Sequence, residues 1–243
     1  MRFLIFINLL IFTVAGDVQK PVLKNFGIPD TEQYTILNRI DKKIGSVIVN
    51  VEMNIKERNG VKYYHVMIKE GDAFLNEVEM NYDDLTTISE KRTDLKNNTL
   101  VEHYIYQGNN KVYFYNKEKN INKIFKVSDA NIYSRYGYVI SFRGFPFSVG
   151  NTVYFKTFMN EYGDALPMKL SCIAIQNVKV KAGSFNCYKL ELTVSGWQSI
   201  LDKDKYYLYF AKDPPHLFIK YEEYPSDGSF DKELISIGNL SKI

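Results

Sequence analysis

Hydrophobic and polar residues alternate along most of the chain, which is the pattern of β-strands with one buried face. Over residues 46–56, valines, Met53 and Ile55 occupy every second position, and asparagine, glutamate and lysine fill most of the others. Successive side chains of a strand point to opposite faces, so this spacing predicts a half-buried strand. Residues 57–60 then end in Asn-Gly, the strongest short hairpin signal, and the chain returns over residues 61–69.

Similar segments recur about every 8 to 12 residues, with turns rich in Gly, Asn, Asp or Pro between many of them. This spacing predicts a mainly β fold: a curved antiparallel sheet, half-barrel or sandwich-like, of roughly a dozen strands. The remaining expected strands are residues 77–80, 85–91, 100–106, 111–116, 121–127, 152–160, 168–180, 184–195, 205–211, 217–224 and 229–237.

One segment departs from the period of two and predicts a helix near residues 130–143 that covers the sheet. Its apolar residues recur at helical spacing: Ile132, Tyr136, Val139 and Ile140. Ser128 or Asp129 can cap the start of this helix, and Gly144 can take a left-handed conformation at its end.

Residues 1–16 have the order of a secretory signal peptide: Arg2, an apolar run, and small residues up to Gly16. Cleavage is expected between Gly16 and Asp17. The apolar run has roughly a dozen residues and a bilayer span needs about 20, so an uncleaved anchor is the less favoured alternative. The expected organisation is an extended segment over residues 17–29, a single β domain over 30–238 and a tail over 239–243. The mature protein is then exported, to the periplasm or secreted, with no integral membrane span.

Composition narrows the possible partners. Lys and Arg number 31 against 28 Asp and Glu, and these charges are interspersed, so nucleic acid is not an expected partner. The chain has 19 Tyr and 16 Phe but a single Trp, an aromatic content that favours strands.

The two cysteines are expected to stay unpaired, with a disulfide as the alternative because export would place them in an oxidising compartment. A turn over residues 181–184 puts Cys187 opposite about Val178, and Cys172 lies about six residues further along the strand. At about 3.3 Å per residue the cysteines are near 20 Å apart, beyond the roughly 7 Å limit between Cα atoms for a disulfide.

No pattern in the sequence indicates catalysis, a metal site or a cofactor. His65, His103 and His216 lie in separate elements, and the chain contains neither a nucleophile elbow nor a glycine-rich phosphate loop. The expectation is therefore a protein that is not an enzyme and needs no cofactor, and a hydrolase of envelope material is the least supported class.

The aromatic residues leave two interpretations of the concave side of the sheet. In the first, the protein's own helix fills it. In the second, it holds a lipid-like ligand, since concave apolar sheet surfaces form good cavities. Trp197, Phe142 and Phe145 are then the candidate lining residues. A structural or assembly protein of the envelope, which meets protein partners through strand edges, is the alternative function.

Several segments resemble an exported bacterial family, domain of unknown function 3108. These are Asp129 followed by a helix ending at Arg143, Phe145-Pro146-Phe147 with Gly150, the run V-K-V-K-A-G-S-F over residues 178–185, residues 207–211 leading into 219–222, and residues 34–36 with 44–45. The resemblance implies an envelope β-protein and supplies no catalytic residue.

Overall fold

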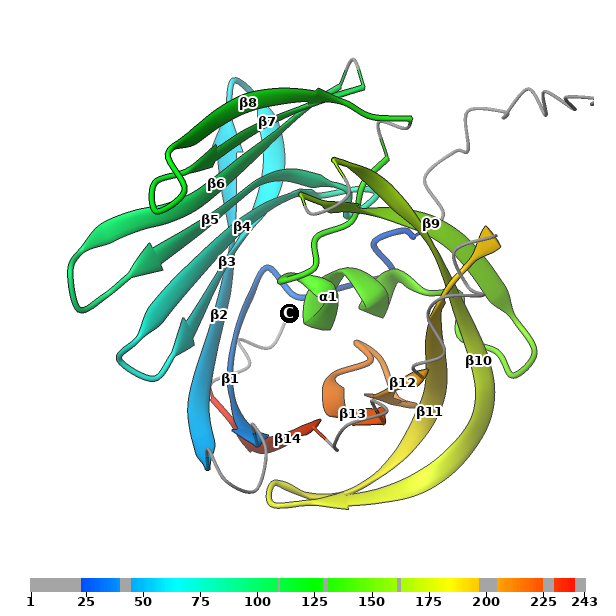
Figure 1. The fold of residues 1–243 in the computed structure, drawn as a ribbon. Coiled ribbons are helices and arrows are strands. Elements are labelled where there is room, and N and C mark those ends of the chain that lie inside the picture. Colours follow the sequence, from blue (N-terminus) through cyan, green and yellow to red (C-terminus); the bar gives the residue numbers. More distant parts are fainter. Residues whose placement is uncertain are drawn as a thin grey trace, which may run out of the picture.

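The computed structural model describes residues 23–39, 45–108, 110–128, 131–160, 163–196, 205–224 and 230–238. Their 14 strands form one antiparallel sheet, which confirms the mainly β fold. The sheet curves around a short helix (Figure 1).

The elements are β1 (Thr31–Arg39), β2 (Ser46–Arg58), β3 (Val61–Glu70), β4 (Phe74–Asn81), β5 (Thr87–Asp94), β6 (Thr99–Gln107), β7 (Lys111–Asn116), β8 (Ile121–Lys126), α1 (Tyr138–Ser141), the 3₁₀ helix η1 (Phe142–Gly144), β9 (Thr152–Met159), β10 (Asp164–Val180), β11 (Gly183–Val194), β12 (Lys205–Ala211), β13 (Phe218–Tyr224) and β14 (Phe230–Ile237). Strands β1 to β8 form one half of the sheet and β9 to β14 the other, and β1 pairs with β14 where the halves join. Strands β8 and β9 are the two edges.

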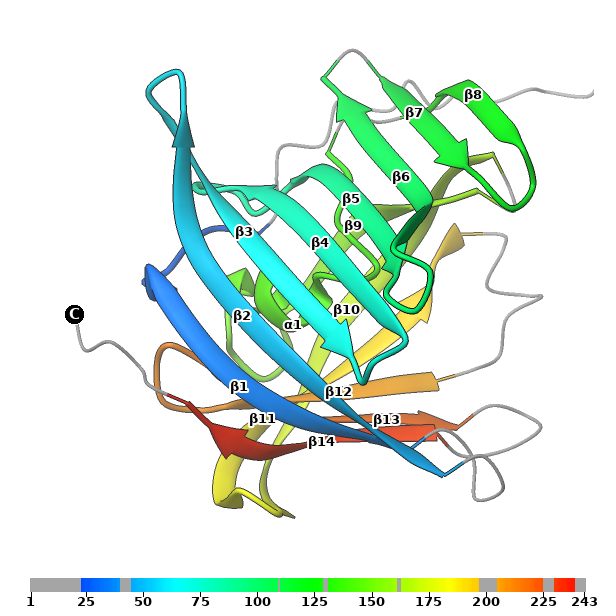
Figure 2. The same cartoon turned by 90° about the vertical axis from the view of Figure 1, so that its left-hand side faces the viewer.

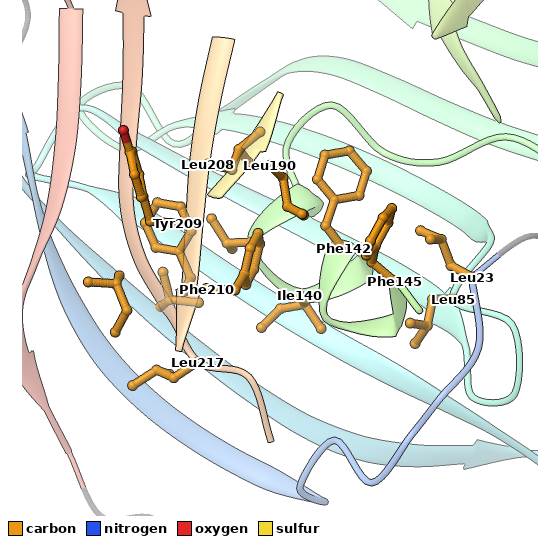
Figure 3. Packing of buried hydrophobic residues seen from close by; sticks show 14 of the residues in the cluster. Leu23, Leu85, Ile140, Phe142, Phe145, Leu190, Leu208, Tyr209, Phe210 and Leu217 are labelled. Atoms are coloured by element: carbon orange, nitrogen blue, oxygen red, sulfur yellow. The ribbon is translucent and has the colours of Figure 1, made fainter. Parts of the chain in front are cut away.

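The core lies on the concave side, between the two halves of the sheet. Figures 1 and 2 place α1 inside the curve, with β2 to β4 facing one side of it and β10 facing the other. Side chains from the helices, the sheet and the amino-terminal segment meet there, as Figure 3 shows for Leu23, Leu85, Ile140, Phe142, Phe145, Leu190 and Leu208.

The helix is much shorter than the predicted segment of residues 130–143. Its turns α1 and η1 cover only Tyr138 to Gly144. Residues before it bond to the sheet instead: Thr87 N donates to Ile132 O at 2.8 Å, and Tyr133 N donates to Lys156 O at 2.9 Å. The expected cap at Ser128 is therefore wrong, because the backbone near Ile132 already forms hydrogen bonds with two strands and the helix begins only at Tyr138. Asp129, the other expected cap, lies outside the described residues.

Gly144 ends the helical segment for a reason other than the predicted left-handed conformation. It does not have a positive φ. A Cβ at this position would lie 2.5 Å from Lys24 O and 2.6 Å from a methyl carbon of Leu85. Glycine is required here because two other segments approach the backbone closely.

The hairpin between β2 and β3 is confirmed. Arg58 pairs with Val61, so Asn59 and Gly60 form a two-residue loop. Their φ angles of 55° and 78° are both positive, as a type I′ turn requires.

The prediction of unpaired cysteines is also confirmed, with a corrected register. Val180 pairs with Gly183, so the turn has only two residues and Cys187 lies opposite Gln176 rather than Val178. Cys172 pairs with Leu190, and both thiols are free and buried.

The amino-terminal segment packs into the interior from residue 23 onward. Leu23 and Ile28 belong to the core, and Lys24 N donates to Gly144 O at 3.2 Å. The predicted signal peptide, its cleavage site at Gly16 and Asp17, and the tail over residues 239–243 lie outside the described residues. Within the described ranges, no helix is long and apolar enough to cross a membrane.

Candidate functional site

A cavity of about 270 Å³ lies between the helical segment and the second half of the sheet. Its walls come from α1, η1, β9 to β13 and the segment before α1. The lining residues are Ser134, Arg135, Tyr138, Phe142, Phe155, Thr157, Met159, Leu166, Met168, Leu192, Val194, Tyr206, Leu208 and Tyr221. Most of them are apolar or aromatic.

Alternation along the strands produces the apolar wall. Strands β10, β11 and β12 each contribute two residues at positions i and i+2, which share one face of the sheet. The register then aligns these rows: Met168 pairs with Phe155 on one side and with Val194 on the other. Neighbouring strands therefore present one continuous apolar surface to the cavity.

Aromatic rings form the boundary of the cavity near α1. The ring centroid of Tyr138 lies 6.2 Å from that of Phe142 and 5.9 Å from that of Tyr221. Tyr206 stacks on Tyr221 at 6.2 Å. Burial raises the pKa of Tyr221, so its hydroxyl stays protonated and donates to Glu223 at 3.1 Å.

Arg135 forms the polar end of the cavity together with Ser134 and Thr157. One guanidinium nitrogen, Nη2, donates to Glu102 Oε2 at 3.3 Å and to the Tyr136 hydroxyl at 3.0 Å. Burial alone would lower the pKa of Arg135, but the surrounding phenols and carboxylates outweigh it and raise that pKa. The guanidinium is thus a fixed cation at the polar end.

A buried carboxyl group lies behind this polar end. Glu90 is 1% exposed and accepts a hydrogen bond from the Tyr106 hydroxyl at 2.7 Å. Its carboxyl group also forms a hydrogen bond with Ser134. Burial raises the pKa of Glu90 and so favours its uncharged form.

A smaller cavity of about 50 Å³ lies against the same Arg135 and Tyr138, which line both cavities. Its other polar lining residues are Asn38, Glu70, Asn76 and Lys232. Arg135 and Tyr138 therefore lie between a largely apolar space and a smaller one lined by both polar and apolar side chains.

The three predicted lining residues have different positions. Phe142 lines the cavity. Phe145 is 1% exposed and packs in the core, where its ring centroid lies 5.4 Å from that of Phe147. Trp197 lies outside the described residues.

Sequence reasoning missed most of the lining. The alternation in residues 205–211 could have placed Tyr206 and Leu208 on one face, because they are two positions apart in a strand. Arg135 had no comparable signal, since it follows no motif and its partner Glu102 is distant in sequence. Among the described residues, no group of three or more His, Cys, Asp or Glu side chains could hold a metal ion.

Comparisons with known proteins show a likeness in structure only. No protein-family profile and no curated protein matches the chain. Among solved structures it is similar to a beta-barrel-like protein of domain of unknown function 1849 from Brucella abortus, with a TM-score of 0.48 and 9% identity, over 88% of this chain and 100% of that one.

Two further solved structures are similar to the chain. One is described as a candidate lipoprotein from Parabacteroides distasonis, with a TM-score of 0.36 and 12% identity, over 90% of this chain and 100% of that one. The other is a candidate exported protein with a YmcC-like fold from Bacteroides fragilis, with a TM-score of 0.30, 12% identity and the same coverage of 90% and 100%. These values are too low to assign a family or a function, so membership of domain of unknown function 3108 stays a prediction.

Proposed function

We propose that this chain is an exported, non-catalytic binding protein that holds one apolar chain in the cavity between α1 and strands β9 to β13. The observation that carries the proposal is the cavity itself, about 270 Å³ with a largely apolar lining. Concave, mostly apolar spaces with a few polar groups at one end are the usual form of small-molecule sites. An apolar cavity of roughly 150 Å³ already binds benzene.

The contrast within the helical segment supports a site for a ligand. Ile140, in α1, is 0% exposed and does not line the cavity, whereas Phe142, two residues later, belongs to the same core cluster and also lines the cavity. The protein's own helix therefore fills only part of the concave side. Leu166 and Leu192 on the sheet are only partly buried, and they face the space that remains.

The size of the cavity limits the ligand. A methylene group takes about as much space as a water molecule, roughly 30 Å³, so the cavity holds about nine chain atoms. One alkyl chain of medium length fits, and a complete two-chain lipid does not. A fatty alcohol, a fatty acid or a similar single-chain amphiphile is the class of ligand we expect.

The alternative, an assembly protein that adds a partner strand to a free edge, has less support. Lys123 and Lys126 lie on the edge strand β8, and lysines on edges discourage strand addition. The free edge of β9 is partly occupied, because Tyr133 N donates to Lys156 O there at 2.9 Å.

Binding of an uncharged naphthylamine dye tests the proposal, since its fluorescence increases in an apolar site. The wild type should bind the dye saturably. Leu192→Trp fills the cavity and should weaken binding at least tenfold. Thr193→Trp is the matched control, because the neighbouring side chain points to the opposite face of β11, and it should bind like the wild type.

Two results would count against a binding protein. One is a wild type that does not bind the dye saturably. The other is an equal effect of Leu192→Trp and Thr193→Trp while urea unfolding shows both variants folded. Mass spectrometry of gently purified protein adds a separate comparison: a co-purifying amphiphile supports the binding protein, and an empty protein that retains an envelope partner supports the assembly protein.

A further inference from the structure

We infer that the head group of the bound amphiphile is uncharged, such as a hydroxyl or an amide, and not a carboxylate or an ammonium. This rests on the proposed function, since it specifies the ligand of the same cavity. The observation behind it is the balance of charges around the polar end.

The cation that a carboxylate head would meet already has a carboxylate partner. Arg135 lines the cavity, and its guanidinium forms an ion pair with Glu102 at 3.3 Å. Glu102 is itself held by Asn116, whose Nδ2 donates to Glu102 Oε1 at 3.1 Å. An anionic head would therefore compete with a side chain that is fixed in place.

The next charged groups outward are balanced in the same way. Arg92 forms an ion pair with Glu70 at 3.2 Å, beside the smaller cavity. Lys232 and Glu223 both lie near Tyr221. Lys232 Nζ is 5.8 Å from the centroid of the Tyr221 ring, and the Glu223 carboxylate accepts a hydrogen bond from the Tyr221 hydroxyl at 3.1 Å.

The helical side adds another matched pair, Arg143 with Glu32. Glu90 is the additional acid in this region. It is 1% exposed, accepts a hydrogen bond from the Tyr106 hydroxyl at 2.7 Å and lines neither cavity, so it is not a counter-charge for a bound head group. Among the described residues, Arg135, Arg92 and Arg143 each have a carboxylate partner, so an ionic head meets no unmatched counter-charge from them at the polar end.

An ionic head would lose part of its hydration at this site, where the Arg135 side chain is 28% exposed, and it would gain no unmatched counter-charge from the residues named above. Burying a charge without a partner is far less favourable than burying a hydroxyl that forms hydrogen bonds. The Arg135 guanidinium can donate to a neutral oxygen, and carboxylate oxygens nearby can accept from a hydroxyl or an amide. The residues named at the polar end can therefore form hydrogen bonds with a neutral head group, but they supply no net charge to bind an ionic one.

Displacement of the naphthylamine dye by 1-nonanol, nonanoate and nonylammonium tests the inference at about pH 8, where the last two are ionised. The three probes share one chain and differ in the head. Nonanol should displace the dye at a concentration at least tenfold lower than either ion, a difference of about 1.4 kcal/mol. Tighter binding of either ion, or equal displacement by all three, would overturn the inference.

A variant that removes one charge tests whether the ion pair of Arg135 and Glu102 causes the preference for an uncharged head group. Glu102→Gln removes the partner of Arg135 and should improve displacement by nonanoate at least tenfold, with little change for nonanol. Glu79→Gln is the matched control. Glu79 also forms an ion pair, with Arg58 at 2.9 Å, and it points away from the core because its neighbours in β4, Val78 and Met80, are core residues. An equal shift in both variants would mean that the local pair does not set the preference.

The proposed function and the inference about the head group are contradicted by different results. If the wild type does not bind the dye, the proposed function fails. If it binds the dye but prefers an ionic amphiphile, only the inference about the head group fails. Should Glu102→Gln not fold, the comparison of the three heads on the wild type still decides the inference.

Discussion

The buried ion pair between Arg143 and Glu32 attaches the helical segment to β1, and breaking it should strongly destabilise the protein. Both side chains are 0% exposed. Arg143 Nη1 donates to Glu32 Oε2, and Arg143 Nε donates to Pro215 O at 2.8 Å. One side chain therefore connects η1 to a strand and to the loop before β13.

Arg143→Met would leave the Glu32 carboxylate buried without its cation. Loss of one partner of a buried pair costs about 3–5 kcal/mol. The Pro215 carbonyl would lose its donor as well, which adds about 1–3 kcal/mol. The total approaches the whole stability of an ordinary domain, about 5–15 kcal/mol, so the variant should be marginally stable.

The double variant Glu32→Leu with Arg143→Met separates these two contributions. The double variant removes the unpaired Glu32 carboxylate, but the Pro215 carbonyl still lacks its donor. Its free energy of unfolding should therefore be about 3–5 kcal/mol higher than that of Arg143→Met. Urea unfolding measures both values, provided that the denaturant dependence is unchanged.

The reasoning is refuted if Arg143→Met loses less than about 1 kcal/mol, since a buried unpaired charge must cost more than that. It is also refuted if the double variant is no more stable than Arg143→Met. Arg143→Lys keeps the charge and loses the forked geometry, so it provides an intermediate case if Arg143→Met is too unstable to purify.

Four smaller predictions follow from single side chains. Ile140→Ala removes a fully buried side chain and should lower the free energy of unfolding by about 2–5 kcal/mol, measured in urea. Gly144→Ala should destabilise by more than about 1 kcal/mol, because its Cβ would meet Lys24 O at 2.5 Å. Glu90→Gln should gain stability relative to the wild type as the pH rises above about 4, the ordinary pKa of a glutamate. Because the pKa of Glu90 is raised in the folded protein, the stability that its carboxyl group contributes is present below the unfolded pKa and is lost as the pH rises through the folded pKa. Burial raises the pKa of Cys187 to about 12, so this thiol should react with an aromatic disulfide reagent only after unfolding.

Each of these measurements has an outcome that contradicts its reasoning. A loss below about 1 kcal/mol for Ile140→Ala would mean that this residue borders space. A neutral Gly144→Ala would mean that the neighbouring backbone moves easily. A stability difference for Glu90→Gln that does not change with pH would mean that burial does not shift the Glu90 carboxyl, and rapid labelling of native protein would mean that Cys187 is accessible.

Much of the sheet could be predicted because its information is local. Period-two alternation in residues 46–56 depends only on which face of a strand is buried, and Asn59-Gly60 fits its turn through its own φ preferences. The separation of Cys172 and Cys187 could be predicted by counting residues along the two strands of one hairpin, although the turn is two residues shorter than expected.

The length of the helix was overestimated. The apolar residues before α1 have helical spacing, but their backbone forms hydrogen bonds with two strands instead of with a helix. Ile132 lies at helical distance from Tyr136, yet its carbonyl accepts Thr87 N and its neighbour Tyr133 bonds to β9. Those strands are distant in sequence, so no local pattern could reveal that they compete for this segment. Gly144 was noticed for its conformational freedom, whereas its actual requirement comes from Lys24 and Leu85.

The sequence by itself determined that this chain forms strands with one buried face, where many of them turn, and that its aromatic residues are numerous enough to line a cavity. Only the tertiary structure decided which of them do. Phe142 and Phe145 are three residues apart and look equivalent in the sequence, and both pack in the core, but only Phe142 also lines the cavity. The pairing of Arg135 with Glu102 likewise depends on how the chain after β8 crosses the concave face. A cavity is the space left between elements that meet through long-range pairing, so its shape and charge are properties of the assembled sheet and of no single segment.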